Sequence, residues 1–406
     1  MEEQKEIIAD LHIHSRFSRA CSKSITIPYL AKWARVKGLN LLGTGDFQHP
    51  EWFKELDVLE EGEGIIYYEG FPFLWQTEIS LMYTKDGKGR RIHYVILAPN
   101  KEVVKQITKF FGSKGRLDYD GRPIFGFSSI ELVEAMENID KDIEIIPAHV
   151  WTPWFGIFGS RSGFNSLKEA FEDKADRIHA IETGMSSDPE MNWRIKGLNK
   201  KSIVSFSDSH SFWPWRIGRE ATIFLGELSY KNILKQIREN SFKATVETDP
   251  GYGIYHWDGH RDCNFSCSPN KSKEINNICP VCNKSLTIGV ENRVEQLADN
   301  PLGFMPQNAK PYYKILPLHE LIALAKASTL ASKKTWQVYN SLIEKFGNEF
   351  NILLFVDKTE LAKFLPNDAL LVELIIKNRI GNIKVKPGYD GVYGEALMPE
   401  KQVKLF

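Results

Sequence analysis

Short apolar runs alternate with amphipathic stretches through residues 1–250, and this alternation limits the folds that the chain can adopt. Runs such as 91–98 and 221–225 predict strands, and stretches such as 129–139 and 230–239 predict helices. Strands that alternate with helices build a mostly parallel sheet or a barrel. Since about seven or eight such units are present, we expect an α/β barrel.

The composition changes near residue 250. Residues 251–313 are rich in Cys, Asn, Ser, Pro and His and show little apolar periodicity, as in a small module that is held together by a metal. A helical pattern follows, and β and turn residues return near the end of the chain. We therefore predict a barrel at 1–250, a zinc-binding module at 251–313 and a mainly helical domain at 314–406.

Charge and hydropathy exclude some classes of protein. Lys+Arg and Asp+Glu number 52 each, so the bulk charge does not indicate a strongly basic nucleic-acid binder. No apolar run reaches the roughly 18 residues of a membrane-spanning helix. The acidic N-terminus lacks the basic and apolar regions of a signal peptide. We expect a cytoplasmic protein with no membrane partner.

Six of the ten histidines lie at or near the ends of predicted strands, usually beside a carboxylate. Residues i and i+2 of a strand share a face, so His12 and His14 can bind one ion together. In a parallel barrel the carboxyl ends of the strands meet at one mouth. The candidate ligands for Zn²⁺, Mn²⁺ or Fe²⁺ are His12, His14, His49, Glu78, His93, His149, Asp208 and His210.

The alternative for each single histidine is an ordinary buried core residue. This alternative is the commoner one for His93 taken alone. It explains the whole set poorly, because each buried ring would need its own hydrogen-bond partner. The metal interpretation therefore depends on the set.

Four of the five cysteines are clustered between residues 263 and 282. Such clustering indicates metal binding, with a disulfide or redox cluster as the alternative. Four thiolates in tetrahedral geometry select Zn²⁺ and leave no open position, so the site would be structural. The predicted zinc ligands are Cys263, Cys267, Cys279 and Cys282. The nearby His256 and His260 could replace one of these ligands, but they are expected to be surface residues.

The segments after His149 and His210 combine aromatic and arginine side chains. These side chains either stack on bases while guanidinium groups hold phosphates, or they pack a lid or an interdomain contact. The sequence leaves both interpretations open. The candidate DNA- or base-binding residues are Trp151, Trp154, Phe155, Phe158, Arg161, Trp213, Trp215, Arg216 and Arg219.

The DLHIHS opening, the later strand-end ligands and the SDSH element resemble the PHP (polymerase and histidinol phosphatase) superfamily over about residues 5–248. The resemblance implies a distorted (β/α)7 barrel with two or three divalent metals (Zn, Mn or Mg). It implies three metal groups, namely His12, His14 and Asp208; Glu78, His93 and His149; and His49 with His210. Phe47 stands where the family usually has a histidine after Asp46.

The predicted chemistry is hydrolysis of a phosphoester by a metal-bound water. Asp208, Glu78 and His149 are the expected catalytic residues, and Asp10 and Asp46 are expected to orient imidazoles from behind. Nucleophile motifs such as G-x-S-x-G are absent from the sequence, which agrees with this mechanism.

The order of barrel, cysteine knuckle, helical region and KVKPGYDGVYGE segment resembles the endonuclease Q enzymes. That resemblance implies a DNA-repair endonuclease that cleaves on the 5′ side of deaminated bases (uracil, hypoxanthine, xanthine) and abasic sites. Its partner would be damaged DNA, double- or single-stranded, in contact with the helical domain and in the nucleoid. We expect a pocket between the barrel mouth and the knuckle to receive the damaged nucleotide.

Two other functions remain open. A small-molecule phosphoesterase of the histidinol-phosphatase type would explain the barrel but not the cysteines. A nucleic-acid-binding module with an inert barrel would leave the ligand set unexplained. Residues 402–406 resemble the first half of a sliding-clamp-binding peptide, and an ordinary polar tail is the alternative.

Overall fold

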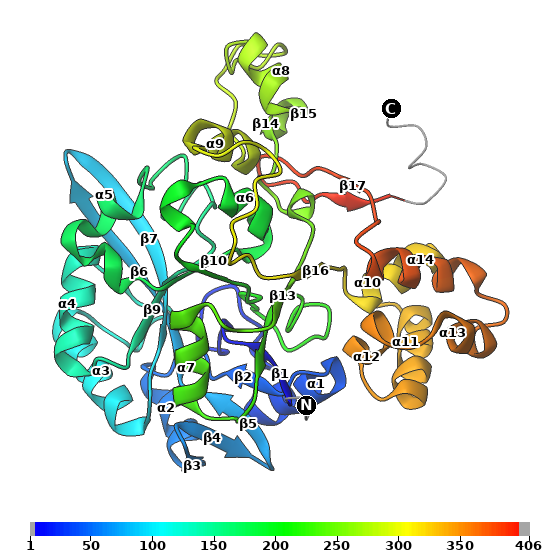
Figure 1. Cartoon of the computed structure of the whole chain (residues 1–406), viewed down its shortest axis with the longest axis horizontal. Helices are drawn as coiled ribbons and strands as arrows, with labels where there is room; N and C mark the ends of the chain where they lie inside the picture. The colour runs from blue at the N-terminus through cyan, green and yellow to red at the C-terminus, as the bar shows by residue number, and fades with distance from the viewer. Residues whose placement is uncertain (1–4, 398–406) are drawn as a thin grey trace.

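The computed structural model describes residues 5–397. Figure 1 shows an α/β body, a small module that projects from it, and a helical region at one side. The peptide at 402–406 lies outside the described residues.

The main sheet of the body runs through the N-terminal strand. Its strands, in spatial order, are β16 (Tyr312–Lys314), β13 (Ala244–Glu247), β12 (Ala221–Leu225), β1 (Glu6–Asp10), β2 (Leu41–Gly43), β5 (Phe71–Leu74), β4 (Ile65–Tyr68) and β3 (Glu60–Gly62). Smaller sheets contain β8 (Ile124–Phe125), β6 (Gln76–Lys85), β7 (Lys88–Leu97) and β9 (Glu144–Pro147), and the pair β10 (Ala180–Glu182) and β11 (Ser202–Val204).

The strand pairing is mixed, which corrects the expectation of a mostly parallel sheet. β1 is parallel to β2 but antiparallel to β12, and β6 and β7 form a long antiparallel hairpin. The two-residue turn at Asp86 and Gly87 explains the hairpin, because both residues have positive φ angles.

Helices surround these sheets and begin at residues suited to helix capping. In α4, for example, Ser128 accepts from the backbone N–H of Glu131, and the Glu131 side chain accepts from that of Ser128. The helices of the body are α1 (Ile27–Lys37), α2 (Pro50–Asp57), α3 (Lys101–Lys114), α4 (Ser129–Ile139), α5 (Leu167–Phe171), α6 (Pro189–Trp193) and α7 (Tyr230–Glu239).

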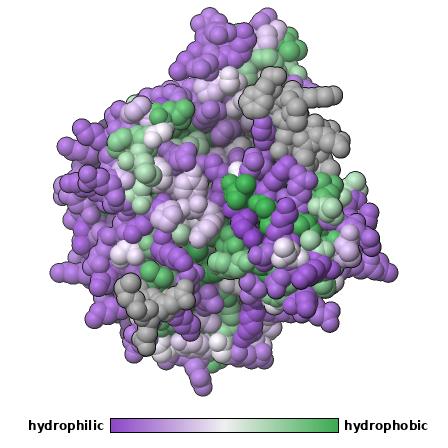
Figure 2. All heavy atoms as spheres, turned by 45° about the vertical axis from the view of Figure 1, so that its right-hand side comes forward, coloured by the Kyte–Doolittle hydropathy of each residue, from purple (hydrophilic) through white to green (hydrophobic). Residues whose placement is uncertain are grey.

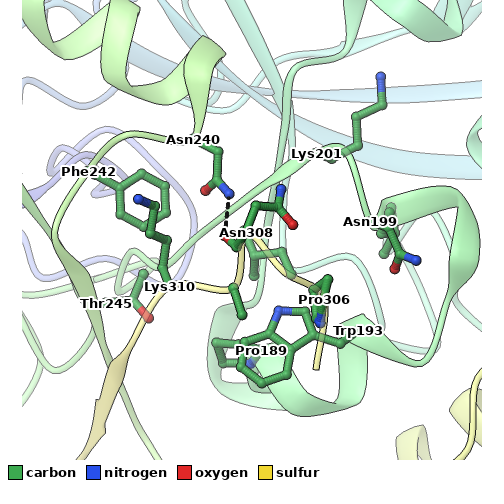
Figure 3. Close-up of a pocket in the computed structure, with 13 residues that line it drawn as sticks. Pro189, Trp193, Asn199, Lys201, Asn240, Phe242, Thr245, Pro306, Asn308 and Lys310 are labelled. Atoms are coloured by element: carbon green, nitrogen blue, oxygen red, sulfur yellow. Dashed lines mark hydrogen bonds between the residues drawn. The ribbon is translucent and has the colours of Figure 1, made fainter. Parts of the chain in front are cut away.

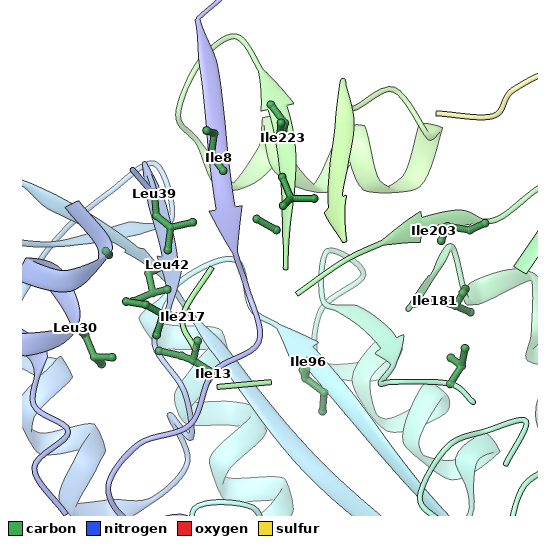
Figure 4. Close-up of a cluster of buried hydrophobic side chains, with 14 of the residues drawn as sticks. Ile8, Ile13, Leu30, Leu39, Leu42, Ile96, Ile181, Ile203, Ile217 and Ile223 are labelled. Atoms are coloured by element: carbon green, nitrogen blue, oxygen red, sulfur yellow. The ribbon is translucent and has the colours of Figure 1, made fainter. Parts of the chain in front are cut away.

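Apolar side chains from the strands and helices form the core of the body. Figure 4 shows Ile8, Leu42 and Ile96, from β1, β2 and β7, together with Leu30 of α1. All four side chains are buried. This packing fixes the ends of the strands that carry the predicted ligands.

The projecting module contains β14 (Asp258–His260), β15 (Phe265–Cys267), α8 (Pro269–Glu274) and α9 (Val290–Leu297). Its buried core consists of little more than Cys267, Cys279 and Leu286. The visible surface of the module is mostly hydrophilic (Figure 2). So small a core needs a further crosslink to hold its fold.

The chain returns from the module across the body before it enters the helical region. In Figure 3 the Asn240 side chain donates to the backbone carbonyl of Asn308, at 2.9 Å. The pocket beside this bond measures about 20 Å³, which is enough for one water molecule. β16 then pairs with β13 and joins this segment to the main sheet.

The helical region contains α10 (Leu318–Lys326), α11 (Lys333–Phe346), α12 (Glu349–Leu354), α13 (Lys358–Phe364) and α14 (Ala369–Arg379). A buried ion pair joins it to α1, because Lys37 Nζ lies 2.7 Å from Glu349 Oε1. The chain then runs back through β17 (Val385–Lys386) and β18 (Glu395–Ala396), where Tyr389 forms a backbone bridge with Trp257. Within residues 5–397 we find no helix of sufficient length and hydropathy to cross a bilayer.

Candidate metal centre

The predicted ligands come together because their strands end at the same place. His12 and His14 follow β1, and Asp208 follows β11. A short parallel bridge between Ile13 and Ser209 joins these two segments, since the backbone N–H of His14 donates to the Ser209 carbonyl at 3.0 Å. Asp208 is thereby held beside both imidazoles.

Two groups of side chains have the spacing of metal ligands. His12, His14, Glu78 and Asp208 each offer one donor atom, and these atoms all lie within 4.8 Å of one another. Glu78, His93 and His149 form a second group by the same criterion. Glu78 belongs to both groups, as expected for a carboxylate between two ions.

Carboxylates behind the cluster orient two of the imidazoles. Glu182 Oε1 lies 2.8 Å from His12 Nδ1, and Asp46 Oδ1 lies 3.0 Å from His14 Nδ1. Both carboxylates are buried. Each holds the Nδ1 proton, so the opposite nitrogen, Nε2, faces the cluster with its lone pair.

A hydroxyl sets the tautomer of His149. Thr152 Oγ1 donates to the His149 backbone carbonyl at 3.0 Å, and therefore accepts from His149 Nδ1 at 2.9 Å. His149 Nε2 faces the second group and lies 3.2 Å from Glu78 Oε1. This arrangement presents another lone pair to the second group.

One atom indicates directly that the cluster is built for a cation. His12 Nε2 is buried and has no hydrogen-bond partner in the structure. It lies 3.5 Å from Glu78 Oε1 and 3.6 Å from Asp208 Oδ1. A buried ring nitrogen that has no hydrogen-bond partner is costly unless an ion is bound there, so these residues fit a divalent metal.

The charges of the cluster favour cations. Burial lowers the pKa of His12, but Glu182, Glu78 and Asp208 outweigh burial, so the pKa lies well above its usual value. In His93 burial prevails over the attraction of Glu78 and lowers the pKa to about 4, so this ring is neutral. The site thus combines a neutral imidazole, that of His93, with buried carboxylates.

The predicted third group is not brought together, because within residues 5–397 neither His49 nor His210 belongs to a group with metal-ligand spacing. His210 Nδ1 donates to the Asp208 carbonyl at 3.0 Å, and its ring lies 4.6 Å from that of His14. His49 instead stacks on Phe17 at 4.2 Å and precedes α2. Phe47 and Gln48 stand between Asp46 and His49, so His49 begins α2 and does not directly follow Asp46.

Asp10 differs from the prediction. It does not hold an imidazole; it accepts from the backbone N–H groups of Ser207 and Gly218, at 3.0 and 2.8 Å. Asp10 therefore fixes the ends of the segment that carries Asp208. The carboxylate that holds His12 is Glu182, at the end of β10, which belongs to no motif that the sequence shows.

Three residues at the centre adopt unusual backbone conformations. The φ angles of Asp46, His149 and Asp208 are 40°, 30° and 48°. Positive φ costs of order 1 kcal/mol or more for residues other than glycine, and it persists where the surrounding structure enforces it. The fold maintains these three conformations at residues that all belong to the centre.

A cavity of about 400 Å³ opens beside the second group. His93, His149 and Asp208 form its floor, and Trp154, Phe155 and Arg219 line it as predicted. The expected wall from the cysteine knuckle is provided instead by Tyr255 and by Tyr393 of the C-terminal hairpin. Arg122, which the sequence did not single out, also lines the cavity.

The other predicted aromatic residues have packing roles. Trp151 is fully buried, donates to Asn192 at 2.8 Å and contacts Phe158. Trp213 and Trp215 stack at 5.3 Å and pack against Trp336 of α11, which is the interdomain alternative.

The two remaining arginines lie apart from the cavity floor. Arg161 is exposed, and its guanidinium lies 5.8 Å from the centre of the Trp154 ring. Arg216 is half-buried and follows the Trp213 turn. Neither is among the residues that line the cavity.

The zinc ligand set needs one correction. The donor atoms of His260, Cys263, Cys279 and Cys282 lie within 4.8 Å of one another, and Cys267 is not part of this group. In the β14–β15 hairpin Cys267 pairs with Asp258, whereas His260 lies at the turn beside Cys263. His260 therefore replaces Cys267 in the group.

The thiol chemistry agrees with a zinc site. Burial raises the pKa of Cys279, but hydrogen bonds from the backbone N–H groups of Cys282 and Val281 lower it to about 7. A partly ionised thiol binds Zn²⁺ readily. Three cysteines and one histidine make a complete tetrahedral set.

Known proteins share this architecture. The crystal structure of the lesion-specific endonuclease PfuEndoQ from Pyrococcus furiosus superposes with a TM-score of 0.87 at 29% identity, over 99% of this chain and 98% of that one. An endonuclease Q complex with a 27-mer duplex carrying an abasic lesion at the active site gives the same TM-score and identity, over 98% of both chains. The chain has the endonuclease Q fold.

Sequence relatives cover the chain unevenly. Residues 317–381, which include α10 to α14, match the family described as the MJ0043 C-terminal domain. The MJ0043 protein of Methanocaldococcus jannaschii is 32% identical over 262 residues, and the match spans 63% of this chain but only 32% of that protein. YqxK of Bacillus subtilis is 27% identical over 96% of this chain and 99% of its own length.

Proposed function

We propose that the protein is a metal-dependent DNA endonuclease that acts in DNA repair. It hydrolyses the phosphodiester bond on the 5′ side of deaminated bases (uracil, hypoxanthine and xanthine) and of abasic sites. One observation carries this proposal. The group of His12, His14, Glu78 and Asp208 opens to a cavity through Asp208, in a chain that superposes on a lesion-specific endonuclease along nearly its whole length. The body would be the distorted (β/α)7 barrel that the sequence predicts.

The metal sites follow from the donor groups. One ion would be held by His12, His14 and Asp208, and a second by His93 and His149, with Glu78 between them. Bound Zn²⁺, Mn²⁺ or Mg²⁺ supplies a hydroxide from water near neutral pH and neutralises charge on the phosphate. A third ion at His210 would lack the predicted ligand His49.

The protein residues prepare this chemistry. Glu182, Asp46 and Thr152 keep the imidazole protons away from the cluster, so the rings bind as neutral ligands. Asp208 and Glu78 provide the negative charge, and Asp208 alone is part-exposed, with 28% of its side chain open to the cavity. Loss of Asp208, Glu78 or His149 would remove activity.

The cavity would receive the damaged nucleotide. Trp154, Phe155 and Tyr255 offer aromatic faces on which a base can stack, and the opening reaches the metal ligands. Extruding a nucleotide costs least where pairing is already weak, as at a deaminated or abasic position. The three segments 1–250, 251–313 and 314–406 would serve as catalytic barrel, zinc module and helical DNA-contacting domain.

Cleavage of a defined duplex tests the proposal. A labelled duplex with a single deoxyuridine, deoxyinosine or abasic site is incubated with the protein and Mn²⁺. We expect one nick, 5′ to the lesion, and none in the undamaged duplex. Asp208→Asn should abolish nicking and largely retain DNA binding. Turnover of a small phosphate monoester with all DNA left intact would favour the histidinol-phosphatase alternative and contradict the proposal.

A further inference from the structure

Arg122 lies between the metal cluster and the cavity. Its Nη1 is 3.0 Å from Glu78 Oε2, and Glu78 is fully buried. The Arg122 side chain keeps 23% of its surface exposed and lines the cavity wall. The guanidinium therefore contacts the carboxylate shared by both metal groups and faces the space that a substrate would fill.

The segment that carries Arg122 is fixed by the same residues that fix the metal ligands. Buried Asp120 accepts from the backbone N–H groups of Arg122 and Arg19, at 3.1 and 3.2 Å. The intervening Gly121 packs so closely on Asp46 that a Cβ atom there would overlap the Asp46 carboxylate. Since Asp46 also holds His14, the guanidinium is held in a defined position relative to the cluster.

A permanent cation at this position is unfavourable for metal binding alone. Glu78 would be neutralised by the ions themselves, and Arg122 then adds repulsion at short range. A guanidinium beside a metal site is favourable when an anionic substrate binds to the metal ions and to the guanidinium at the same time. Its fork of N–H donors matches two oxygens of a phosphate group.

Arg219, the other arginine that lines the cavity, differs from Arg122 because its donors already bind the protein backbone. Arg219 donates from Nε and Nη2 to the Ser207 carbonyl, at 3.3 and 2.9 Å. Those donors are committed to the backbone beside Asp208. Within residues 5–397, the Arg122 side chain forms a hydrogen bond only from Nη1, to the Glu78 carboxylate.

We propose that Arg122 binds the phosphate group that undergoes hydrolysis. It places that group over the metal cluster and stabilises its developing negative charge. The inference rests on the proposed function for the identity of the phosphate as a DNA phosphodiester. The guanidinium contact itself requires only a phosphate anion.

The test measures phosphate and metal binding separately. Inorganic phosphate is titrated calorimetrically into Mn²⁺-loaded wild type, Arg122→Gln, Arg122→Lys and the control Arg116→Gln. Arg116 belongs to the same loop, is 75% exposed and pairs with Asp118. Metal affinity is measured by Mn²⁺ titration of each metal-stripped variant, and nicking is then measured on a duplex with one deoxyuridine.

Arg122→Gln should weaken phosphate binding by about ten- to a hundredfold. It should bind Mn²⁺ at least as tightly as the wild type, because a nearby positive charge is lost. The phosphate affinity of Arg122→Lys should lie between those of the wild type and Arg122→Gln, because an ammonium group keeps the positive charge but lacks the forked pair of N–H donors. Arg116→Gln should match the wild type in every assay.

Unchanged phosphate affinity in Arg122→Gln would overturn the inference. So would a parallel loss of Mn²⁺ and phosphate binding, which indicates a structural role. If Arg122→Gln does not fold, wild-type phosphate affinity in Arg122→Lys overturns the specific role of the guanidinium fork. Phosphate binding is measured without DNA, so it remains decisive even if the protein fails to nick damaged DNA.

Discussion

Replacing Glu182 by glutamine tests whether the imidazoles are oriented from behind the cluster. Glu182 Oε1 accepts from His12 Nδ1, and Oε2 accepts from the backbone N–H of His149, both at 2.8 Å. A glutamine has one acceptor oxygen and one NH₂ group, so it cannot satisfy both donors. If its amide donates to His12 Nδ1, the imidazole proton moves to Nε2, where the metal should bind.

The expected effect is large enough to measure. Removing the carboxylate behind a metal-bound imidazole costs about 10- to 100-fold in metal affinity. This loss corresponds to about 1.4–2.8 kcal/mol. Since Glu182 is fully buried, the lost charge-assisted hydrogen bonds should also lower the free energy of unfolding by about 1.5–3 kcal/mol.

Calorimetric titration of metal-stripped protein with Mn²⁺ gives the affinity, and chemical denaturation gives the stability. The matched control is Glu144→Gln. Glu144 is also buried and holds a histidine, with Oε1 3.0 Å from His179 Nδ1, but it lies at the opposite end of β9 from His149. We expect both variants to lose stability and only Glu182→Gln to lose Mn²⁺ affinity. Equal affinities in the two variants would refute the reasoning.

Three further predictions concern the zinc site, the interdomain contact and the response to pH. His260→Ala should lose the structural zinc and Cys267→Ser should keep it, as measured by elemental analysis of zinc per chain. The reverse result would show that the four cysteines are the zinc ligands. Lys37→Met leaves the buried Glu349 carboxylate without its ion-pair partner, and it should lower the free energy of unfolding in denaturant by about 3–5 kcal/mol. The double variant Lys37→Met/Glu349→Leu should recover part of this loss in stability. The carboxylates outweigh burial and raise the pKa of His12, so without metal its ring keeps its second proton to a higher pH than an ordinary histidine does. Mn²⁺ binding should therefore release protons, and the Mn²⁺ affinity should rise with pH. In metal-free protein, the contribution of the protonated His12 ring to stability should be lost as pH rises through its raised pKa. An Mn²⁺ affinity that does not depend on pH would contradict this prediction.

Local sequence patterns were sufficient to predict several elements. The predicted helix at 230–239 coincides with α7, and the predicted strand at 221–225 coincides with β12. These segments have strong periodicity and clear capping residues, such as Ser229 before α7. The antiparallel pairing of β1 with β12 could not be predicted, because it joins segments more than 200 residues apart through tertiary packing alone.

The candidate ligands were predictable where two of them share a short spacing. His12 and His14 are two residues apart on one strand, so the sequence itself places them on one face. Glu182 and Arg122 have no such neighbour, and only the meeting of β10 and the 115–123 loop with the cluster reveals their roles. Their residue types alone are too common to indicate a site.

The sequence offered His260 as a possible replacement ligand, and the spacing of the zinc ligands supports that alternative. His260 and Cys263 are separated by two residues, as are Cys279 and Cys282, so the pairs have matched spacing. Counting cysteines alone favoured Cys267, which is separated from Cys263 by three residues. Hairpin geometry decides between them, because the turn after His260 brings this ring next to the Cys282 sulfur at 3.4 Å.

The central claim is that the strand-end side chains form a metal centre. An anomalous difference map from a crystal soaked in Mn²⁺ tests it most directly. We predict one peak in contact with His12, His14 and Asp208 and a second beside His93 and His149, with Glu78 reaching both. A map without peaks at these side chains, from protein that still binds Mn²⁺ elsewhere, would contradict the account.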